Sequence, residues 1–132
     1  IKRAEFVKTQ EGAITEIDIR LTIENKSMTE LRNVTLIDHV PALMQLVWKP
    51  KHTFRPKKIT AVPHGHVMYW NFDLTPQEER ILTYTVAPKL SVIGELHLPS
   101  AALKYVYDRH ELKAHSNDVY VTNLRMDEKA SE

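Results

Sequence analysis

The sequence contains no cysteine and only three glycines in 132 residues. Without cysteine it can form no disulfide, thiol nucleophile or thiolate metal site. Neither GxGxxG nor GxxxxGK[ST] occurs, which excludes glycine-rich phosphate loops. No apolar run approaches the roughly 18 residues of a membrane-spanning helix. No basic-then-apolar leader is visible, and we expect a chain that begins at Ile1 to be a piece of a longer protein.

The charges are nearly balanced, with 18 basic and 17 acidic residues and a net charge of +1. This balance argues against a strongly basic nucleic-acid module. Hydrophobic residues make up 42% and charged residues 27%, which excludes global disorder. The length indicates one domain. We predict a single β-sandwich domain over residues 1–126 and a frayed tail over residues 127–132.

Alternation of apolar and polar residues dominates the chain and predicts half-buried strands. The clearest case has Ile17, Ile19, Leu21 and Ile23 on one face. Extended segments are expected at 4–9, 17–24, 34–40, 57–62, 66–74, 80–86, 95–107 and 112–121. Their spacing of about ten residues predicts an all-β fold, an antiparallel sandwich of about 7–9 strands, and argues against βαβ units.

Three positions qualify this strand pattern. Thr75-Pro76-Gln77-Glu78 has a capping-box pattern, but the β-branched alternation that follows favours a turn. Residues 41–48 fit one or two helical turns or a strand equally well, and both remain open. Pro99 suggests a bulge or an edge within residues 95–107. Trp70, with apolar neighbours two residues away on each side, is expected to fill the space between two sheets.

Several segments occur in an order that carries a resemblance: NVTLIDHVP at 33–41, WNFDLTPQEERILTYTVAP at 70–88, ALKYVYD at 102–108 and SNDV at 116–119. The order resembles a conserved repeat domain of unknown function found in archaeal and bacterial cell-surface proteins. One departure is the turn at 75–78, which lacks the glycine usual there. The resemblance implies an immunoglobulin-like β-sandwich that acts as an extracellular or cell-surface spacer or adhesion module. Its partners would be neighbouring domains or copies of the parent protein.

No motif points to catalysis, and we expect no catalytic, cofactor-binding or metal-binding residues. His64 and His66 would share a face of a strand, but no cysteine or acidic residue lies nearby to complete a metal site. Asp38 and His39 are adjacent on a strand and so face opposite sides. No GxSxG nucleophile elbow occurs. We predict that the chain is not an enzyme.

A basic cluster is the most informative charge pattern. No acidic residue lies within 39–71, and Trp48 and Phe54 interleave with the basic residues there. We consider an anion-binding site made of Lys49, Lys51, Arg55, Lys57 and Lys58, in which the odd-numbered residues project together if the segment is extended. Its partner would be an anionic surface polymer: a cell-wall glycan, a lipid surface or nucleic acid, with no specific nucleic acid expected. The favoured alternative is a solvated loop with Trp48 in the core. A third is docking of this loop on the acidic remainder of the next copy.

Two N-x-[ST] sequences, at Asn25 and Asn33, are candidates for glycosylation. Such an asparagine is usable only where it is exposed. Asn25 is expected in a turn and is the better candidate, whereas Asn33 is expected to enter a strand.

Overall fold

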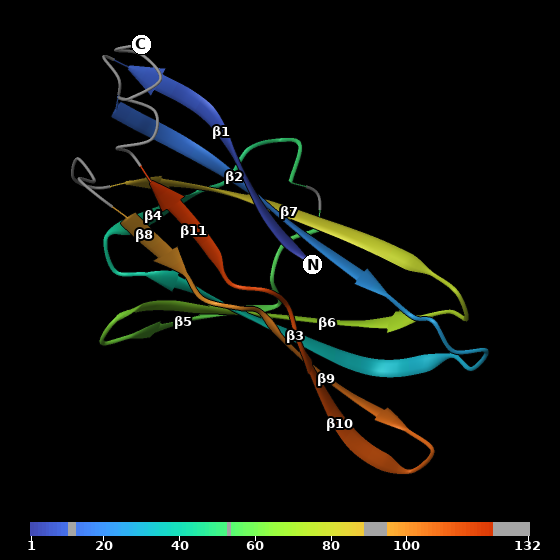
Figure 1. Ribbon diagram of the computed structural model, residues 1–132. Coiled ribbons are helices and arrows are strands. Elements are labelled where there is room, and N and C mark those ends of the chain that lie inside the picture. The colour runs from blue at the N-terminus through green and yellow to red at the C-terminus, as the bar shows by residue number, and fades with distance from the viewer. Residues whose placement is uncertain (11–12, 53, 89–94, 123–132) are drawn as a thin grey trace.

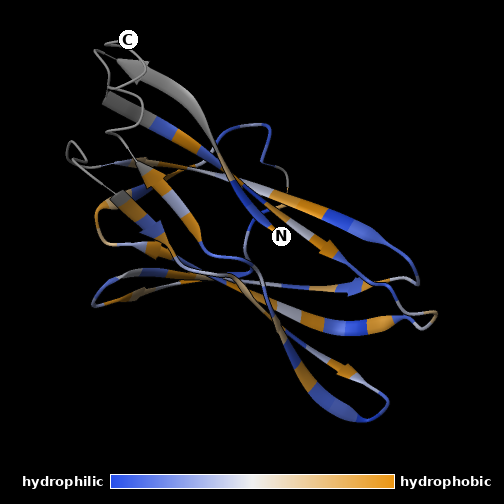
Figure 2. Ribbon diagram, in the orientation of Figure 1, coloured by the Kyte–Doolittle hydropathy of each residue, from blue (hydrophilic) through white to orange (hydrophobic). Residues whose placement is uncertain are grey.

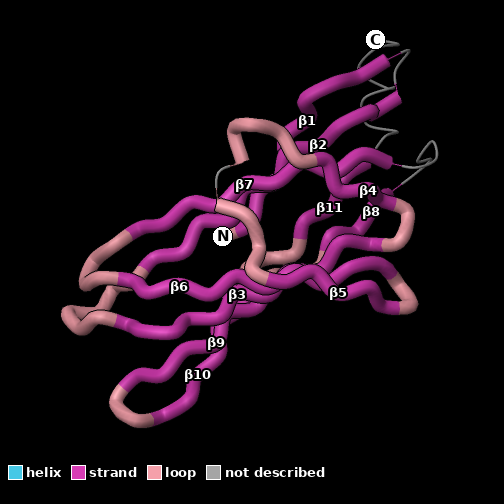
Figure 3. The backbone as a smooth tube through the Cα atoms, turned by 180° about the vertical axis from the view of Figure 1, so that it is seen from behind, coloured by secondary structure: helices cyan, strands magenta, loops and turns pink. Residues whose placement is uncertain are grey.

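A computed structural model of the protein describes residues 1–10, 13–52, 54–88 and 95–122. Within these ranges the chain consists of strands, turns and loops, and none of the described residues is helical (Figure 3). The eleven strands are β1 (Lys2–Gln10), β2 (Ala13–Glu24), β3 (Leu31–Pro41), β4 (Met44–Val47), β5 (Lys58–Val62), β6 (Gly65–Leu74), β7 (Glu79–Pro88), β8 (Glu95–Leu98), β9 (Ala102–Tyr107), β10 (His110–His115) and β11 (Val119–Thr122).

The strands form a sandwich (Figure 1). One sheet has the order β1-β2-β7-β4, the other has the order β10-β9-β3-β6-β5, and β11 pairs with β8. All the strand pairs are antiparallel. The predicted all-β sandwich is therefore confirmed, while an immunoglobulin-like strand order remains a prediction.

The core lies between the two larger sheets, and apolar and polar residues alternate along most strands (Figure 2). Trp70 on β6 is 1% exposed, and its ring centroid lies 6.2 Å from that of Tyr84 on β7. The indole nitrogen of Trp70 donates a hydrogen bond to the carbonyl of Phe54 at 3.2 Å. The prediction that Trp70 fills the space between the sheets is confirmed.

The strand number exceeds the prediction of 7–9 because two of the eight expected strands are each divided and the segment left open at 41–48 adds one more. Residues 95–107 separate at Pro99 into β8 and β9, which belong to different sheets, and residues 112–121 separate into β10 and β11. The segment left open at 41–48 contains a strand, β4, with Met44 buried. Thr75–Glu78 is a turn, as expected, in which the Glu78 N–H donates to the Thr75 carbonyl at 3.1 Å.

Gly65 is the position where the fold depends on a missing side chain. Its φ angle is +134°, and a Cβ atom there would lie 1.9 Å from the carbonyl oxygen of Val40. Only glycine meets both constraints without a backbone shift. Gly65 therefore allows the turn after β5 to approach the end of β3 closely.

Candidate functional site

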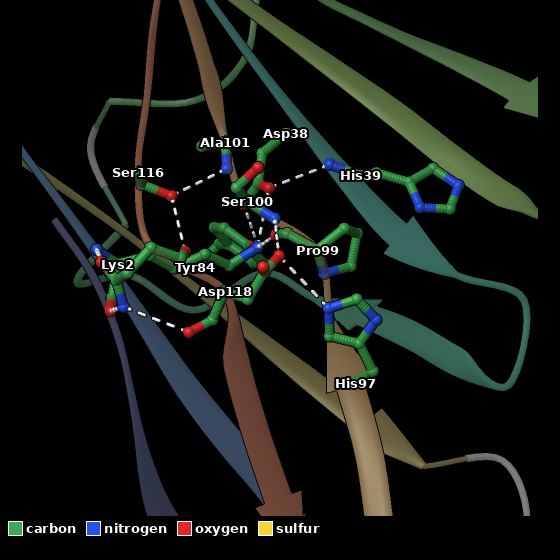
Figure 4. A network of polar contacts seen from close by, with 11 residues as sticks. Lys2, Asp38, His39, Tyr84, His97, Pro99, Ser100, Ala101, Ser116 and Asp118 are labelled. Atoms are coloured by element: carbon green, nitrogen blue, oxygen red, sulfur yellow. Dashed lines mark hydrogen bonds and ion pairs between the residues drawn. The ribbon is translucent and has the colours of Figure 1, made fainter.

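The most deeply buried charged groups of the described chain form a network between the two sheets (Figure 4). Lys2 on β1, Asp38 on β3 and Tyr84 on β7 are each 1% exposed. The Lys2 ammonium lies 2.7 Å from Asp38 Oδ1 and also donates to the carbonyl of Pro99 at 2.7 Å. The Tyr84 hydroxyl donates to Asp38 Oδ2. One carboxylate thus joins three strands from both sheets.

The alternation along β3 explains why Asp38 lies inside. Val34, Leu36 and Val40 face the core, and Asp38 has the same parity. The backbone N–H of His39 also donates to Asp38 Oδ1 at 3.0 Å. The sequence analysis did not predict this network. An acidic residue on an otherwise apolar strand face, as at Asp38, could have indicated a buried carboxylate. Nothing in the sequence marks Lys2 as its partner.

The environment of the network favours one protonation state for the tyrosine. Burial, and then the adjacent Asp38 carboxylate, raise the pKa of Tyr84 well above its ordinary value. Tyr84 therefore remains a hydroxyl donor at all ordinary pH values. Because the three side chains are closed off from solvent and bonded to one another, the arrangement is suited to joining strands and offers no access to a substrate.

A second set of contacts fixes the same end of β1. The Lys2 backbone N–H donates to Asn117 Oδ1 at 2.9 Å, and Asn117 Nδ2 donates to the Lys2 carbonyl at 2.9 Å. The neighbours of Asn117 hold the segment before β9 (Figure 4). Ser116 Oγ accepts from the Ala101 N–H at 2.8 Å, and Asp118 Oδ1 accepts from the Ser100 N–H at 3.1 Å. We call the contacts of Lys2 with Asp38, Pro99 and Asn117 the Lys2 clamp.

The basic cluster does not form one site. The His52 N–H donates to the Lys49 carbonyl at 2.9 Å, so the chain turns there and is not extended. Lys49 pairs with Glu16, and Lys51 lies 2.5 Å from Asp18 Oδ2; both acidic residues belong to β2. The extended backbone on which the odd-numbered basic residues would project together is therefore absent here, because the chain turns between Lys49 and His52.

The other three residues of the cluster lie elsewhere. Arg55 lies over the Trp48 ring at 5.3 Å, and Trp48 is half-buried against the core. Lys58, at the start of β5, lies over the Tyr69 ring at 5.8 Å on the other sheet. Lys57 and Lys58 are exposed. The cluster is thus divided between the two sheets.

His52 attaches the basic loop, the segment between β4 and β5 that carries most of the basic cluster, to the outer face of the four-stranded sheet. It is 3% exposed, and its ring nitrogens lie 3.1 Å from Thr83 Oγ1 and 2.8 Å from Thr85 Oγ1. Burial, and then the charge of Lys51, lower the pKa of His52. Thr85 also donates to Asp18 at 2.5 Å. Burial alone would raise the pKa of Asp18, but the hydrogen bonds from Lys51 and Thr85 outweigh it and lower that pKa.

The lowered pKa of His52 predicts a pH-dependent stability. Below pH of about 6.5 the unfolded chain binds a proton at His52 that the folded chain resists, so the free energy of unfolding falls as the solution is acidified from pH 7 to pH 5. Urea unfolding at several pH values measures this change. A His52→Gln variant should show a flatter dependence over the same interval, and an unchanged slope would contradict the role of His52.

The histidines weighed as metal ligands lie on the β5–β6 hairpin, with His64 exposed and His66 half-buried. No group of three or more metal-ligating side chains occurs in the part of the chain that the structure describes. Asp38 lies in the core while His39 is half-exposed, so the two residues do face opposite sides.

The structure reverses the order of the two glycosylation candidates. Asn25 is 2% exposed, and its amide nitrogen donates to the carbonyls of Thr29, Leu74 and Thr75. The expectation that Asn25 is the accessible acceptor is wrong, because its side chain organises the turn after β2. Asn33 is exposed, at an irregularity of β3 where its φ angle is 58°.

No family model and no curated protein matches the sequence. Among solved structures, the fold is similar to a GH20 exo-β-N-acetylglucosaminidase from Vibrio harveyi in complex with N-acetylglucosamine, and to the D437A inactive mutant of that enzyme. Each match has a TM-score of 0.50 and 12% identity, and covers 86% of this chain but 17% of the longer chain. At this identity the likeness concerns the fold alone. No helix among the described residues is long and apolar enough to cross a membrane.

Proposed function

We propose that this chain is a non-catalytic β-sandwich module of a larger cell-surface or secreted protein. Its role is mechanical: it spaces, stiffens or presents neighbouring domains. The resemblance to surface repeat domains supports this role. The fold comparison is compatible with it, since a sandwich of this kind occurs there as a small part of a longer chain. The observation that supports this role most directly is the Lys2 clamp, in which buried charges hold β1 in place.

The clamp lies where tension between the two ends of the domain would act. Figure 1 shows β1 and β11 running in the same direction, and the two strands are in contact. Tension pulls β1 from its first residue and β11 from its last, so the strands are forced to slide lengthwise past each other. The two hydrogen bonds between Lys2 and Asn117 lie across the pulling direction, so the force acts on both of them at the same time.

A variant that removes only the backbone bridge tests the proposal. In a tandem array pulled at constant speed, Asn117→Ala should unfold at a lower force than the wild type, because forced unfolding follows the unfolding rate. Its equilibrium stability should fall by only about 1–2 kcal/mol, the contribution of two hydrogen bonds.

The matched control is Asn71→Ala, which removes an exposed amide that donates to Thr35 Oγ1 at 3.3 Å, away from the Lys2 clamp. We expect its unfolding force to equal that of the wild type. Equal forces for Asn117→Ala and the wild type would contradict the mechanical proposal.

A further inference from the structure

A row of side chains crosses the outer face of the five-stranded sheet. The strand register places Lys113 of β10 opposite Lys104 of β9, Lys104 opposite Thr35 of β3, and Thr35 opposite Asn71 of β6. Neighbouring strands lie 4.7–4.9 Å apart, so the row with β5 spans about 19 Å. Residues nearly eighty positions apart in the sequence are thereby brought into one line.

The row ends at a shallow hollow lined by Thr35, Lys57, Lys58, Tyr69 and Asn71, together with part of Trp70. Lys58 faces Tyr69 across the strand pair and lies over its ring. Thr35 and Asn71 are linked by a hydrogen bond of 3.3 Å and contribute a hydroxyl and an amide to the floor. We call Lys57, Lys58, Lys104 and Lys113, with Thr35, Tyr69 and Asn71 between them, the lysine row.

The charges of the lysine row are not compensated within the described chain. None of its four lysines has a carboxylate within ion-pair distance among the described residues. Lys104 and Lys113 are direct cross-strand partners, and like charges in that position destabilise a sheet. On the same face, Glu111 lies two residues from Lys113 along β10, and Asp73 on β6 accepts the Asn33 N–H at 2.8 Å. A bound anion would relieve this repulsion.

The shape and chemistry of the lysine row favour one class of ligand. The row is narrow and linear, which suits a polymer with repeated charges. Its centre offers hydroxyl and amide groups, which hydrogen-bond to sugar hydroxyls. Binding of single-stranded nucleic acid uses a series of aromatic side chains for stacking, whereas Tyr69 is one ring with Lys58 already over it.

We infer that the lysine row binds a linear anionic polysaccharide that carries carboxylate, phosphate or sulfate groups. This inference goes beyond the mechanical role, because it assigns an attachment surface to the module. It also replaces the anion site expected at residues 49–58, of which only Lys57 and Lys58 belong to the row.

The test compares the wild type with a K57Q/K58Q/K104Q/K113Q variant by titration with oligogalacturonate at several salt concentrations. The wild type should bind at low salt, with a logarithmic salt slope of about −3 for four lysine contacts. The variant should bind at least about tenfold more weakly with a shallower slope. The control R20Q/K26Q/R32Q/R109Q removes the same charge elsewhere and should bind as the wild type does. Circular dichroism and melting curves establish that both variants are folded.

Two further probes decide the ligand class, namely phosphatidylglycerol vesicles and oligo-dT. The polysaccharide assignment would be overturned if the wild type bound either probe more tightly than oligogalacturonate and if the lysine-row variant lost that binding. The site itself is overturned if the wild type does not bind oligogalacturonate at low salt, if the lysine-row variant binds as tightly, or if the control loses as much affinity. None of these results depends on the force measurements, so the two proposals fail independently.

Discussion

Replacing Asp38 by Ala should lower the free energy of unfolding by about 3–5 kcal/mol, which is typical of breaking a buried ion pair. The substitution leaves the Lys2 ammonium in the core with the Pro99 carbonyl as its remaining described partner, and leaves the Tyr84 hydroxyl without its acceptor. An uncompensated buried charge costs far more than the net value of the pair. Urea unfolding followed by circular dichroism measures the change.

A combined variant separates that penalty from simple loss of packing. K2M/D38L/Y84F replaces all three polar groups with apolar ones of similar size, and its stability should lie much closer to the wild type than that of Asp38→Ala. If the single substitution costs less than about 1 kcal/mol, Asp38 is not the buried acceptor that the geometry indicates.

Replacing Trp70 by Ala should cost about 3–5 kcal/mol, because it leaves a cavity between the sheets. The lost contacts include the Tyr84 ring and the hydrogen bond to the Phe54 carbonyl, which holds the end of the basic loop.

The Trp70→Phe variant retains most of the packing and loses the hydrogen bond, so we expect it to be clearly less destabilised. Chemical denaturation of both variants provides the test. A cost below about 1 kcal/mol for Trp70→Ala would place this side chain at the surface, contrary to the structure.

The sequence predicted those strands that have one solvent-exposed face and one buried face. The apolar residues keep a period of two over residues 17–23 of β2 and over residues 82–86 of β7, so the core residues Ile19 and Leu82 were identifiable from parity alone. Pro99 was expected to mark a bulge or an edge, whereas the chain passes there from one sheet to another, and the break before β11 was not identified. Strand ends at both places depend on the pairing partners. The pairing of β2 with β7 and of β3 with β9 joins distant segments, which local patterns do not specify.

The site was less predictable than the fold, because charges act across space. The five basic residues at 49–58 are neighbours in sequence, yet Glu16 and Asp18 engage two of them from β2. Lys104 and Lys113 carried no signal in the sequence, since only the register aligns them with β3 and β6. The Lys2 clamp could not be predicted for the same reason, because its residues are distant in the sequence and meet only in the folded chain.

The most direct test of the mechanical proposal compares two pulling directions on the same folded chain. Handles at the two ends load β1 and β11 lengthwise. Handles at Ile1 and at a Lys26→Cys site, unique because the chain has no cysteine, peel β1 from β2 starting at the Ile1–Thr22 pair. We predict a markedly higher unfolding force between the ends than along the peeling direction. Equal forces in both directions would contradict the claim that this module is built to bear load.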